Sequence, residues 1–235
     1  MKHYNEILDA KLLSYSQPSE EFEDMGIGDA QELIAYCARV SNPTNQLNTE
    51  TSGKLIRYLI KHQHWSPLEM VSACLEITVT RDIARQILRH RSFSFQEFSQ
   101  RYADPVKELD FVLRDARLQD TKNRQNSIAL DMVNDDHRRI AYQWEILQTE
   151  LVEKVKNIYT WAVEHGIAKE QARAVCPEGL TVSRLYMNGT LRSWIHYLEL
   201  RMANGTQLEH IMIANECAKA IAKIFPMTDE LLQNS

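Results

Sequence analysis

The apolar residues recur at two different spacings, which predict a chain of mixed helices and strands. Spacing of three to four residues predicts helices at about 30–40, 49–62, 81–91, 130–162, 169–175 and 190–203, and from 207 to Pro226. Alternation of apolar and polar residues predicts strands at 71–80 and 180–187, the second turning at Asn188-Gly189. We expect further strands at 5–16 and 106–113, loops at 18–29 and 92–104, and an exposed insertion at 114–126.

The stripe from Leu130 to Ala162 predicts the longest helix, with Gly166 as its C-terminal cap. Unbroken, it would be ~50 Å long at 1.5 Å per residue. Asn134-Asp135-Asp136 can interrupt it near its start. So long an apolar stripe is more typical of core or subunit packing than of a binding site, and we interpret Trp144 and His137 within it in that way.

The composition adds limits on the class of protein. With 235 residues, 44% of them hydrophobic, the chain can bury a full core as a single domain, residues 1–235. A formal net charge of -5 does not indicate a general nucleic-acid binder. The sequence shows neither an apolar run of the ~20 residues that cross a bilayer nor an apolar signal core at the N-terminus. Its four cysteines form no Cys-x-x-Cys pair. We therefore expect a soluble, cytoplasmic protein without membrane or nucleic-acid partners.

The segment from Arg81 to Arg101 is locally basic within this acidic chain. It carries five arginines, no lysine and two acids, Asp82 and Glu97. Arginine in place of lysine favours planar, bidentate recognition of phosphate or carboxylate. Three phenylalanines and the hydroxyls of three serines lie among the charges, a mixture more typical of a cleft than of a solvated face. From the residues alone we predict a site for a phosphorylated small molecule, and the reaction does not follow from them.

Other chemistries have weaker support in the sequence. His62 and His64 have metal-ligand spacing, yet no third histidine or cysteine nearby completes a set, and we expect no metal. Cys176 is a candidate nucleophile without a basic neighbour in sequence, so a structural thiol is favoured. Ser99 lacks a Gly-x-Ser-x-Gly elbow. Glu69 and Glu97 are 28 residues apart and give no paired-carboxylate signal. The alternative class is a non-enzymatic nucleic-acid or phosphate-binding module that uses the arginine face, and five arginines with three phenylalanines would suit single-stranded RNA.

The spacing Arg89-His90-Arg91, seven residues, then Ser99 resembles the signature of the flavin-dependent thymidylate synthases. Residues 62–104 and 168–225 carry the similarity, and the rest matches only in length and helical character. Further segments that resemble the family are His64-x-Ser66-Pro67-x-Glu69, Ala84-Arg85-Gln86, Arg101-Tyr102, Ala172-Arg173, Leu191-Arg192-Ser193 and Leu200-Arg201.

This resemblance implies an enzyme that methylates dUMP reductively to dTMP. Methylenetetrahydrofolate would give the carbon, NADPH the electrons, and FAD would relay the hydride. Flavin contacts are implied for Ser66, Glu69, Arg89, His90, Arg91, Arg192 and His196. Nucleotide contacts are implied for Gln86, Glu97, Ser99, Gln100, Arg101, Arg173 and Arg201. Arg201 would polarise a uracil carbonyl, His64 would lie over the flavin ring, and Ser99 would be a positioning hydroxyl rather than a nucleophile.

The resemblance also implies a fold, an assembly and a location. The family's fold is α+β, a central and mainly antiparallel sheet surrounded by helices, and the element order given above agrees with it. The family forms homotetramers with sites between subunits, and the location would be cytoplasmic, in the host if the source is a virus. The chain departs from the usual family pattern at Gln96, where members often carry Asn, at Gln100, where they often carry Gly, and at Gly205, where some carry a flavin-contacting His.

Overall fold

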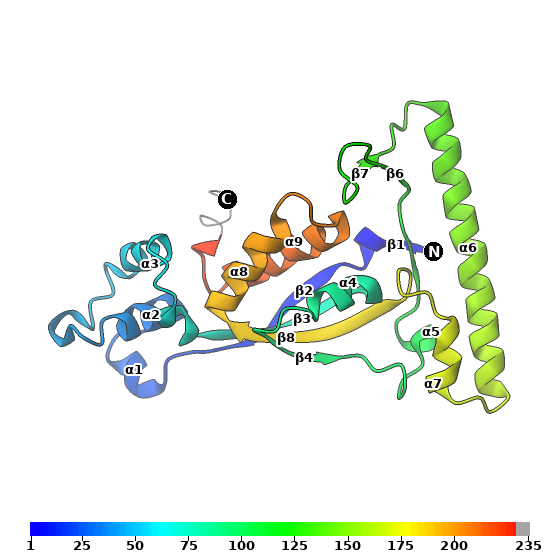
Figure 1. Cartoon of the computed structure of the whole chain (residues 1–235). Coiled ribbons are helices and arrows are strands. Elements are labelled where there is room, and N and C mark those ends of the chain that lie inside the picture. The colour runs from blue at the N-terminus through cyan, green and yellow to red at the C-terminus, as the bar shows by residue number, and fades with distance from the viewer. Residues whose placement is uncertain (229–235) are drawn as a thin grey trace.

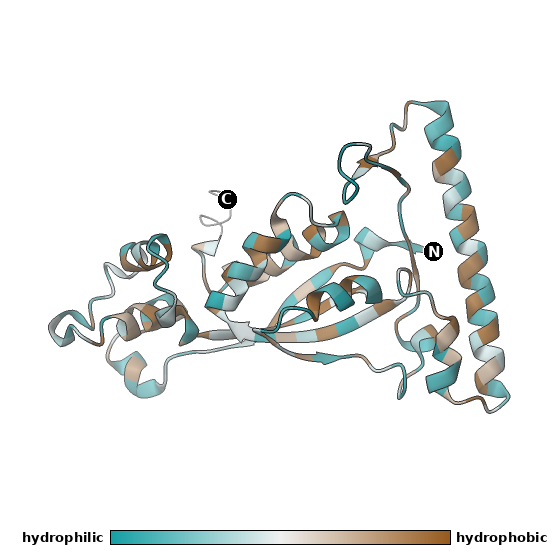
Figure 2. Ribbon diagram, in the orientation of Figure 1, coloured by the Kyte–Doolittle hydropathy of each residue, from teal (hydrophilic) through white to brown (hydrophobic). Residues whose placement is uncertain are grey.

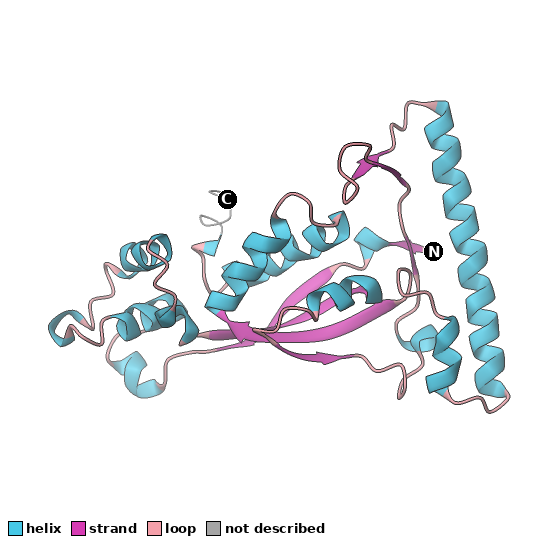
Figure 3. Cartoon of the chain, viewed as in Figure 1, coloured by secondary structure: helices cyan, strands magenta, loops and turns pink. Residues whose placement is uncertain are grey.

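A four-stranded antiparallel sheet forms the centre of the molecule (Figures 1 and 3). In the computed structural model, which describes residues 1–228, the strand order is β2 (Asp9–Tyr15), β3 (Ser72–Thr80), β8 (Val182–Thr190) and β4 (Ser94–Glu97). The expected α+β fold with a mainly antiparallel sheet is confirmed. The expected single domain, 1–235, extends into residues 229–235, which lie outside the described part.

The strand β3 shows why this sheet forms. Its alternate side chains Ala73, Leu75, Ile77 and Val79 are at most 1% exposed, so one face of the strand is entirely apolar and buried. Burying each of the larger side chains stabilises the fold by about 1.5–3 kcal/mol. The helices α8 (Leu191–Met202) and α9 (Leu208–Ala222) pack against each other and on the sheet, and the indole of Trp194 in α8 donates to the carbonyl of Ala73 at 3.0 Å.

The two central strands each continue directly into a helix. α4 (Arg81–Ile87) follows β3, and α8 follows β8. α4 buries Ile83, Ala84 and Ile87, and the chain then turns back as β4 along β8, with Glu97 opposite Leu185. The motif from Arg89 to Ser99 therefore lies between α4 and the edge of the sheet, close to the first turns of α8.

The two ends of the molecule carry separate helical groups. α1 (Glu20–Asp24), α2 (Ala30–Ala38) and α3 (Ser52–Lys61) lie at one end, and the long α6 (Asp135–Glu164) stands at the other (Figure 1). Figure 2 shows apolar residues recurring along α6. The remaining short elements are 3₁₀ turns at Tyr4–Glu6, Pro43–Asn45, Ser66–Glu69 and Arg173–Val175, helices α5 (Pro105–Glu108) and α7 (Lys169–Ala172), and strands β1 (Lys2–His3), β5 (Val112–Leu113), β6 (Arg117–Gln119) and β7 (Ser127–Ala129).

Several expected boundaries are wrong. β8 does not turn at Asn188-Gly189 but continues to Thr190, because β3 pairs with it along its whole length. Part of the expected loop 92–104 forms β4, since Phe95 finds a partner strand in β8 that the sequence does not reveal. The expected loop 18–29 contains α1.

The region 104–135 also differs from expectation. Of the expected strand 106–113, Val112–Leu113 forms β5 and Phe111 forms a single bridge to Thr181. The start of the segment is helical instead, because Asp104 caps a turn that Pro105 begins. The expected exposed insertion 114–126 is exposed only in part. Thr121, Lys122, Arg124 and Gln125 are exposed, whereas the side chains of Arg114 and Arg117 turn inward, at 12% and 20% exposure. The long helix begins at Asp135 rather than Leu130, with Asn134 accepting backbone N–H bonds as its N-cap.

Among residues 1–228, no helix is both long and apolar enough to span a bilayer.

The close approach of Gly189 and Phe93 gives a test of this packing. A Cβ on Gly189 would lie 2.4 Å from Cδ1 of Phe93, which is shorter than any van der Waals contact between carbon atoms. Gly189→Ala is expected to lower the free energy of unfolding by about 1–3 kcal/mol, because the buried Phe93 ring must move. Gly53→Ala is the matched control: its Cβ would meet nothing nearer than 3.7 Å, and in α3 it should raise stability by about 0.5–1 kcal/mol. Denaturant unfolding measures both, and equal effects would contradict the packing described.

Candidate functional site

The Arg-His-Arg motif lies in the turn after α4. The backbone N–H groups of Arg89 and His90 donate to Gln86 and Ile87, and that of Phe93 donates to His90, so the chain reverses tightly here. Phe93 is buried and anchors the turn against Trp194 of α8, their ring centroids 4.9 Å apart. Arg89 and Arg91 are exposed, whereas His90 is half-buried. Two cations therefore reach outward from a rigid turn.

His90 meets Arg201, which is 111 residues further along the chain. Nε of Arg201 donates to Nε2 of His90 at 2.8 Å, so this ring nitrogen is unprotonated. Burial and the charge of Arg201 lower the pKa of His90 to about 4, so the ring is neutral at neutral pH. The ring also lies edge-on to Tyr197, with centroids 4.9 Å apart. A neutral histidine thus orients the arginine expected to be catalytic.

Glu97 is held by two arginines of α4. Its carboxylate accepts from Arg85 at 3.0 Å and from the Ser183 hydroxyl at 2.9 Å, and Arg81 lies 3.8 Å away. The side chain of Glu97 is 15% exposed. Arg81 and Arg85 were not expected as site residues, although the sequence places them one turn apart on the same helix face. Glu178 lies 3.7 Å from both.

The serine end of the motif approaches α7. Arg101 forms an ion pair with Glu170 at 3.4 Å, and Nε of Arg173 donates to the carbonyl of Glu170 at 3.4 Å. Two of the expected nucleotide-binding arginines are therefore brought together. The carbonyl of Ser99 accepts the N–H groups of the next turn, and its hydroxyl accepts that of Arg101 at 3.4 Å. Gln100 is buried, 3% exposed, with its side-chain nitrogen unpartnered among the described residues.

A second group of expected residues meets between the 3₁₀ turn Ser66–Glu69 and α8. Arg192 forms an ion pair with Glu69, and the Trp65 ring lies edge-on to that of His196, with centroids 4.5 Å apart. Ser66, which follows Trp65 in the sequence, is exposed. His64 is also exposed, and its ring faces Tyr58 of α3 at 6.2 Å.

Gln86 of α4 points toward α9. Its amide oxygen lies 3.2 Å from Nδ1 of His210, and its amide nitrogen donates to Gln207 at 2.7 Å. His210 and Gln207 were not expected as site residues, because they are 121 or more residues from Gln86 and carry no motif.

The weaker alternatives gain no support from the geometry. Burial raises the pKa of the Cys176 thiol to about 11, which suppresses the thiolate that a nucleophile requires. Within the described residues, neither a histidine nor a carboxylate is hydrogen-bonded to the Ser99 hydroxyl. Glu69 and Glu97 pair with arginines on different helices. No group of three His, Cys, Asp or Glu side chains in residues 1–228 is placed to hold a metal.

The donors fit a flavin dinucleotide and a nucleotide, but one chain does not enclose them. Exposed Arg89 and Arg91 suit a pyrophosphate, and Arg101 and Arg173 suit a phosphate. The cavities of about 610 and 540 Å³ along α6 and between α2 and α3 are not lined by these arginines, and another of about 540 Å³ lies beside Arg114, Gln207 and Glu209. Apolar side chains of α6 are exposed, between 40% and 51%, at Ile140, Trp144, Leu147, Leu151 and Ile158. Exposed apolar patches of this kind are typical of interaction surfaces in general.

Comparison with known proteins agrees with this geometry. Residues 6–227 match the family model described as "Thymidylate synthase complementing protein". The chain is 48% identical over 219 residues to a probable flavin-dependent thymidylate synthase of Paramecium bursaria Chlorella virus 1, covering 93% of this chain and 96% of that protein. It is 44% identical over 227 residues to the flavin-dependent thymidylate synthase of Synechocystis sp. (strain PCC 6803), covering 96% and 100%.

A solved structure is similar as well. The UMP/dUMP methylase PolB from Streptomyces cacaoi, bound with 5-Br dUMP, superposes with a TM-score of 0.77 at 26% identity, covering 97% of this chain and 95% of that one. The family model spans nearly the whole chain, and both relatives align almost end to end. This protein is therefore an enzyme that belongs to the flavin-dependent thymidylate synthase family.

Proposed function

We propose that the protein methylates dUMP reductively to dTMP, with FAD as its cofactor and methylenetetrahydrofolate and NADPH as co-substrates. The observation that carries the proposal is the contact between His90 and Arg201. It joins the Arg-His-Arg motif to the Leu200-Arg201 segment in a chain that belongs to this family. The dUMP methylase named among the similar structures supports the nucleotide substrate.

The serine end of the motif would bind the nucleotide. Arg101, which pairs with the Glu170 carboxylate, and Arg173, which donates to the Glu170 carbonyl, supply positive charge for a phosphate. Ser99 supplies a short hydroxyl donor. Glu97 is fixed by Arg81 and Arg85, which leaves its remaining lone pairs to accept from a hydroxyl group of the sugar. Gln86 and Gln100 complete the expected nucleotide contacts.

Arg201 would act at the uracil ring. Its guanidinium carries further N–H groups besides the one given to His90, and these can polarise a carbonyl on which negative charge develops as hydride arrives. Because His90 is neutral, it accepts from Arg201 without adding a competing positive charge. The arginine is thus positioned before any substrate binds.

The Arg-His-Arg end, with Ser66, Glu69, Arg192 and His196, would hold the flavin. Arg192 and Glu69 are paired across two elements, and Trp65 and His196 form an aromatic edge beside them. FAD, when bound, supplies the hydride transfer that no side chain can perform. His64 precedes Trp65 and Ser66 in the sequence and is exposed. It is proposed to contact the folate or nicotinamide ring stacked on the flavin.

The active assembly is proposed to be a cytoplasmic homotetramer with sites shared between subunits. Arg89 and Arg91 are open to solvent in one chain, and α6 exposes an apolar stripe at the far end of the molecule (Figure 2). A partner chain would both cover the stripe and close the site, which explains why cationic side chains lie on an open surface.

The first test is colour. We expect a yellow protein as purified, whose flavin absorbance NADPH bleaches faster when dUMP is present than in the same mixture without dUMP. A colourless preparation that takes up neither FAD nor dUMP would contradict the proposal.

The second test separates positioning from nucleophilic roles of Ser99. Ser99→Ala is expected to raise the dissociation constant for dUMP by about 5–10-fold, since one hydrogen bond to a charged group is lost, and to leave measurable turnover at saturating dUMP. Ser94→Ala, on the exposed side of β4, is the control and should change neither. Loss of turnover with an unchanged dissociation constant for dUMP would instead support a nucleophilic role for Ser99.

The third test concerns assembly. Sedimentation should give about four times the 27.3 kDa chain mass. Leu147→Glu should lower the mass, because it places a charge in the apolar stripe. Tyr142, 67% exposed, lies on the opposite side of α6 at 100° per residue, so Tyr142→Glu is the control. A wild-type mass of 27.3 kDa would refute the shared site.

A further inference from the structure

A row of hydrogen-bonded side chains runs behind Gln86. The amide of Gln86 contacts Nδ1 of His210 at 3.2 Å on one side and Oε1 of Gln207 at 2.7 Å on the other. Beyond them, Nε2 of His210 contacts the Tyr197 hydroxyl at 3.2 Å, and Nε2 of Gln207 donates to Glu209 at 2.9 Å. These five side chains, called the Gln86 relay below, come from α4, α8, α9 and the loop before α9.

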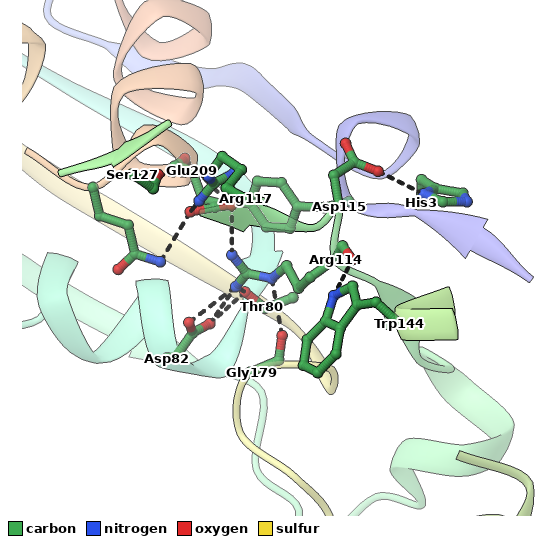
Figure 4. Close-up of polar contacts among 12 residues, drawn as sticks. His3, Thr80, Asp82, Arg114, Asp115, Arg117, Ser127, Trp144, Gly179 and Glu209 are labelled. Atoms are coloured by element: carbon green, nitrogen blue, oxygen red, sulfur yellow. Dashed lines mark hydrogen bonds and ion pairs between the residues drawn. The ribbon is translucent and has the colours of Figure 1, made fainter. Parts of the chain in front are cut away.

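Glu209 is the fixed end of the relay. Its side chain is 4% exposed, and its carboxylate lies 2.7 Å from Arg117 and 3.2 Å from Arg114. Burial opposes its ionised form, but the Arg117 hydrogen bond and the Arg114 charge outweigh burial and hold the pKa at about 2. Figure 4 shows the two arginines converging on Glu209. This carboxylate can therefore only accept hydrogen bonds.

The anchor is itself rigid. Arg114 also binds the Asp82 carboxylate at 2.7 Å and donates to the Gly179 carbonyl at 3.0 Å (Figure 4). Asp82 accepts from the Thr80 hydroxyl at the start of α4. One guanidinium thus ties α4, which carries Gln86, to the residue that ends the relay.

An ionised Glu209 sets the direction of every other bond in the row. Gln207 must turn its nitrogen toward Glu209, so its oxygen faces Gln86 and accepts from the Gln86 nitrogen. The Gln86 oxygen then faces His210 and accepts from Nδ1–H. His210 is fully buried and neutral, because burial and the Arg201 charge lower its pKa to about 3, so its Nε2 accepts from the Tyr197 hydroxyl.

We propose that Gln207 and His210 are positioning residues, which fix the Gln86 amide so that it meets the nucleotide with its second N–H as a donor. One lone pair on the oxygen and one N–H remain after the relay bonds are made. Glu209 prevents the amide from turning over, which would present the oxygen where the N–H now lies. The group recognised is an oxygen acceptor of the substrate. This inference rests on the proposed binding of dUMP at Gln86.

The relay differs from ordinary core packing in a testable way. Gln207 is half-buried in the loop before α9, and among the described residues its side chain hydrogen-bonds to Gln86 and Glu209. Gln207→Leu cuts the row between Gln86 and its anchor while leaving both arginine contacts of Glu209 in place. The fold should therefore survive this substitution.

The first experiment measures dUMP affinity in the flavin-loaded protein. Gln207→Leu is expected to raise the dissociation constant for dUMP about five- to tenfold, with flavin content unchanged and turnover at saturating dUMP within about twofold. The double variant Gln86→Leu/Gln207→Leu should bind no more weakly than Gln86→Leu alone, because Gln207 acts through Gln86. Gln119→Leu, which removes amide contacts within the β6–β7 hairpin, is the control and should match wild type.

An unchanged dissociation constant in Gln207→Leu, or additive losses in the double variant, would overturn the proposal.

The second experiment determines the protonation of the His210 ring without substrate, by nitrogen NMR of ¹⁵N-histidine-labelled protein. The His210 signal is assigned as the one that is lost in His210→Asn. The expected signal is a neutral ring protonated at Nδ1, and an Nε2–H ring in the wild type would overturn it. Failure of the wild type to bind dUMP would refute the proposed function, while this spectrum still decides the direction of the relay.

Discussion

The pairing of β3 with β8 is the constraint on which the rest of the structure depends. It runs in register from Ser72 opposite Thr190 to Thr80 opposite Val182, and each strand continues directly into a helix. Because the strands are antiparallel, α4 and α8 leave the pair at opposite ends. The turn after α4 then returns toward α8, and His90 meets Arg201 across 111 residues of sequence. The site is thus built where two strand–helix units meet.

Charge in this protein is divided between paired and open arginines. Arg81, Arg85, Arg114 and Arg117 have carboxylate partners, and these ion pairs fix Glu97 and Glu209. Arg89 and Arg91 instead face solvent. These four ion pairs therefore stabilise the scaffold, whereas Arg89 and Arg91 remain open to anionic ligands. The more exposed pairs Arg101–Glu170 and Arg192–Glu69 lie at the proposed site. Placing neutral His90 and His210 near Arg201 keeps the cationic character of that region concentrated on one side chain.

Local sequence signals decide local structure well when a single segment contains all the interacting residues. The 3.6-residue stripe from Ile140 onward produces α6, and the alternation from Ser72 produces β3. The signals fail when the partner is remote. β4 exists because β8 is beside it, and Gly189 continues a strand rather than turning because β3 pairs with β8 through this residue.

The sequence by itself determined the family, through the spacing of Arg89, His90, Arg91 and Ser99, and with it the α+β fold class. Motif spacing carries this information because the ligands demand those groups at fixed separations along the segment that runs from the turn after α4 through β4. Only the tertiary structure decided which distant side chains serve the motif: Arg201 on His90, two arginines on Glu97, and Gln207 with His210 on Gln86. Such contacts depend on how helices pack across the sheet, and no local pattern of residues encodes that packing.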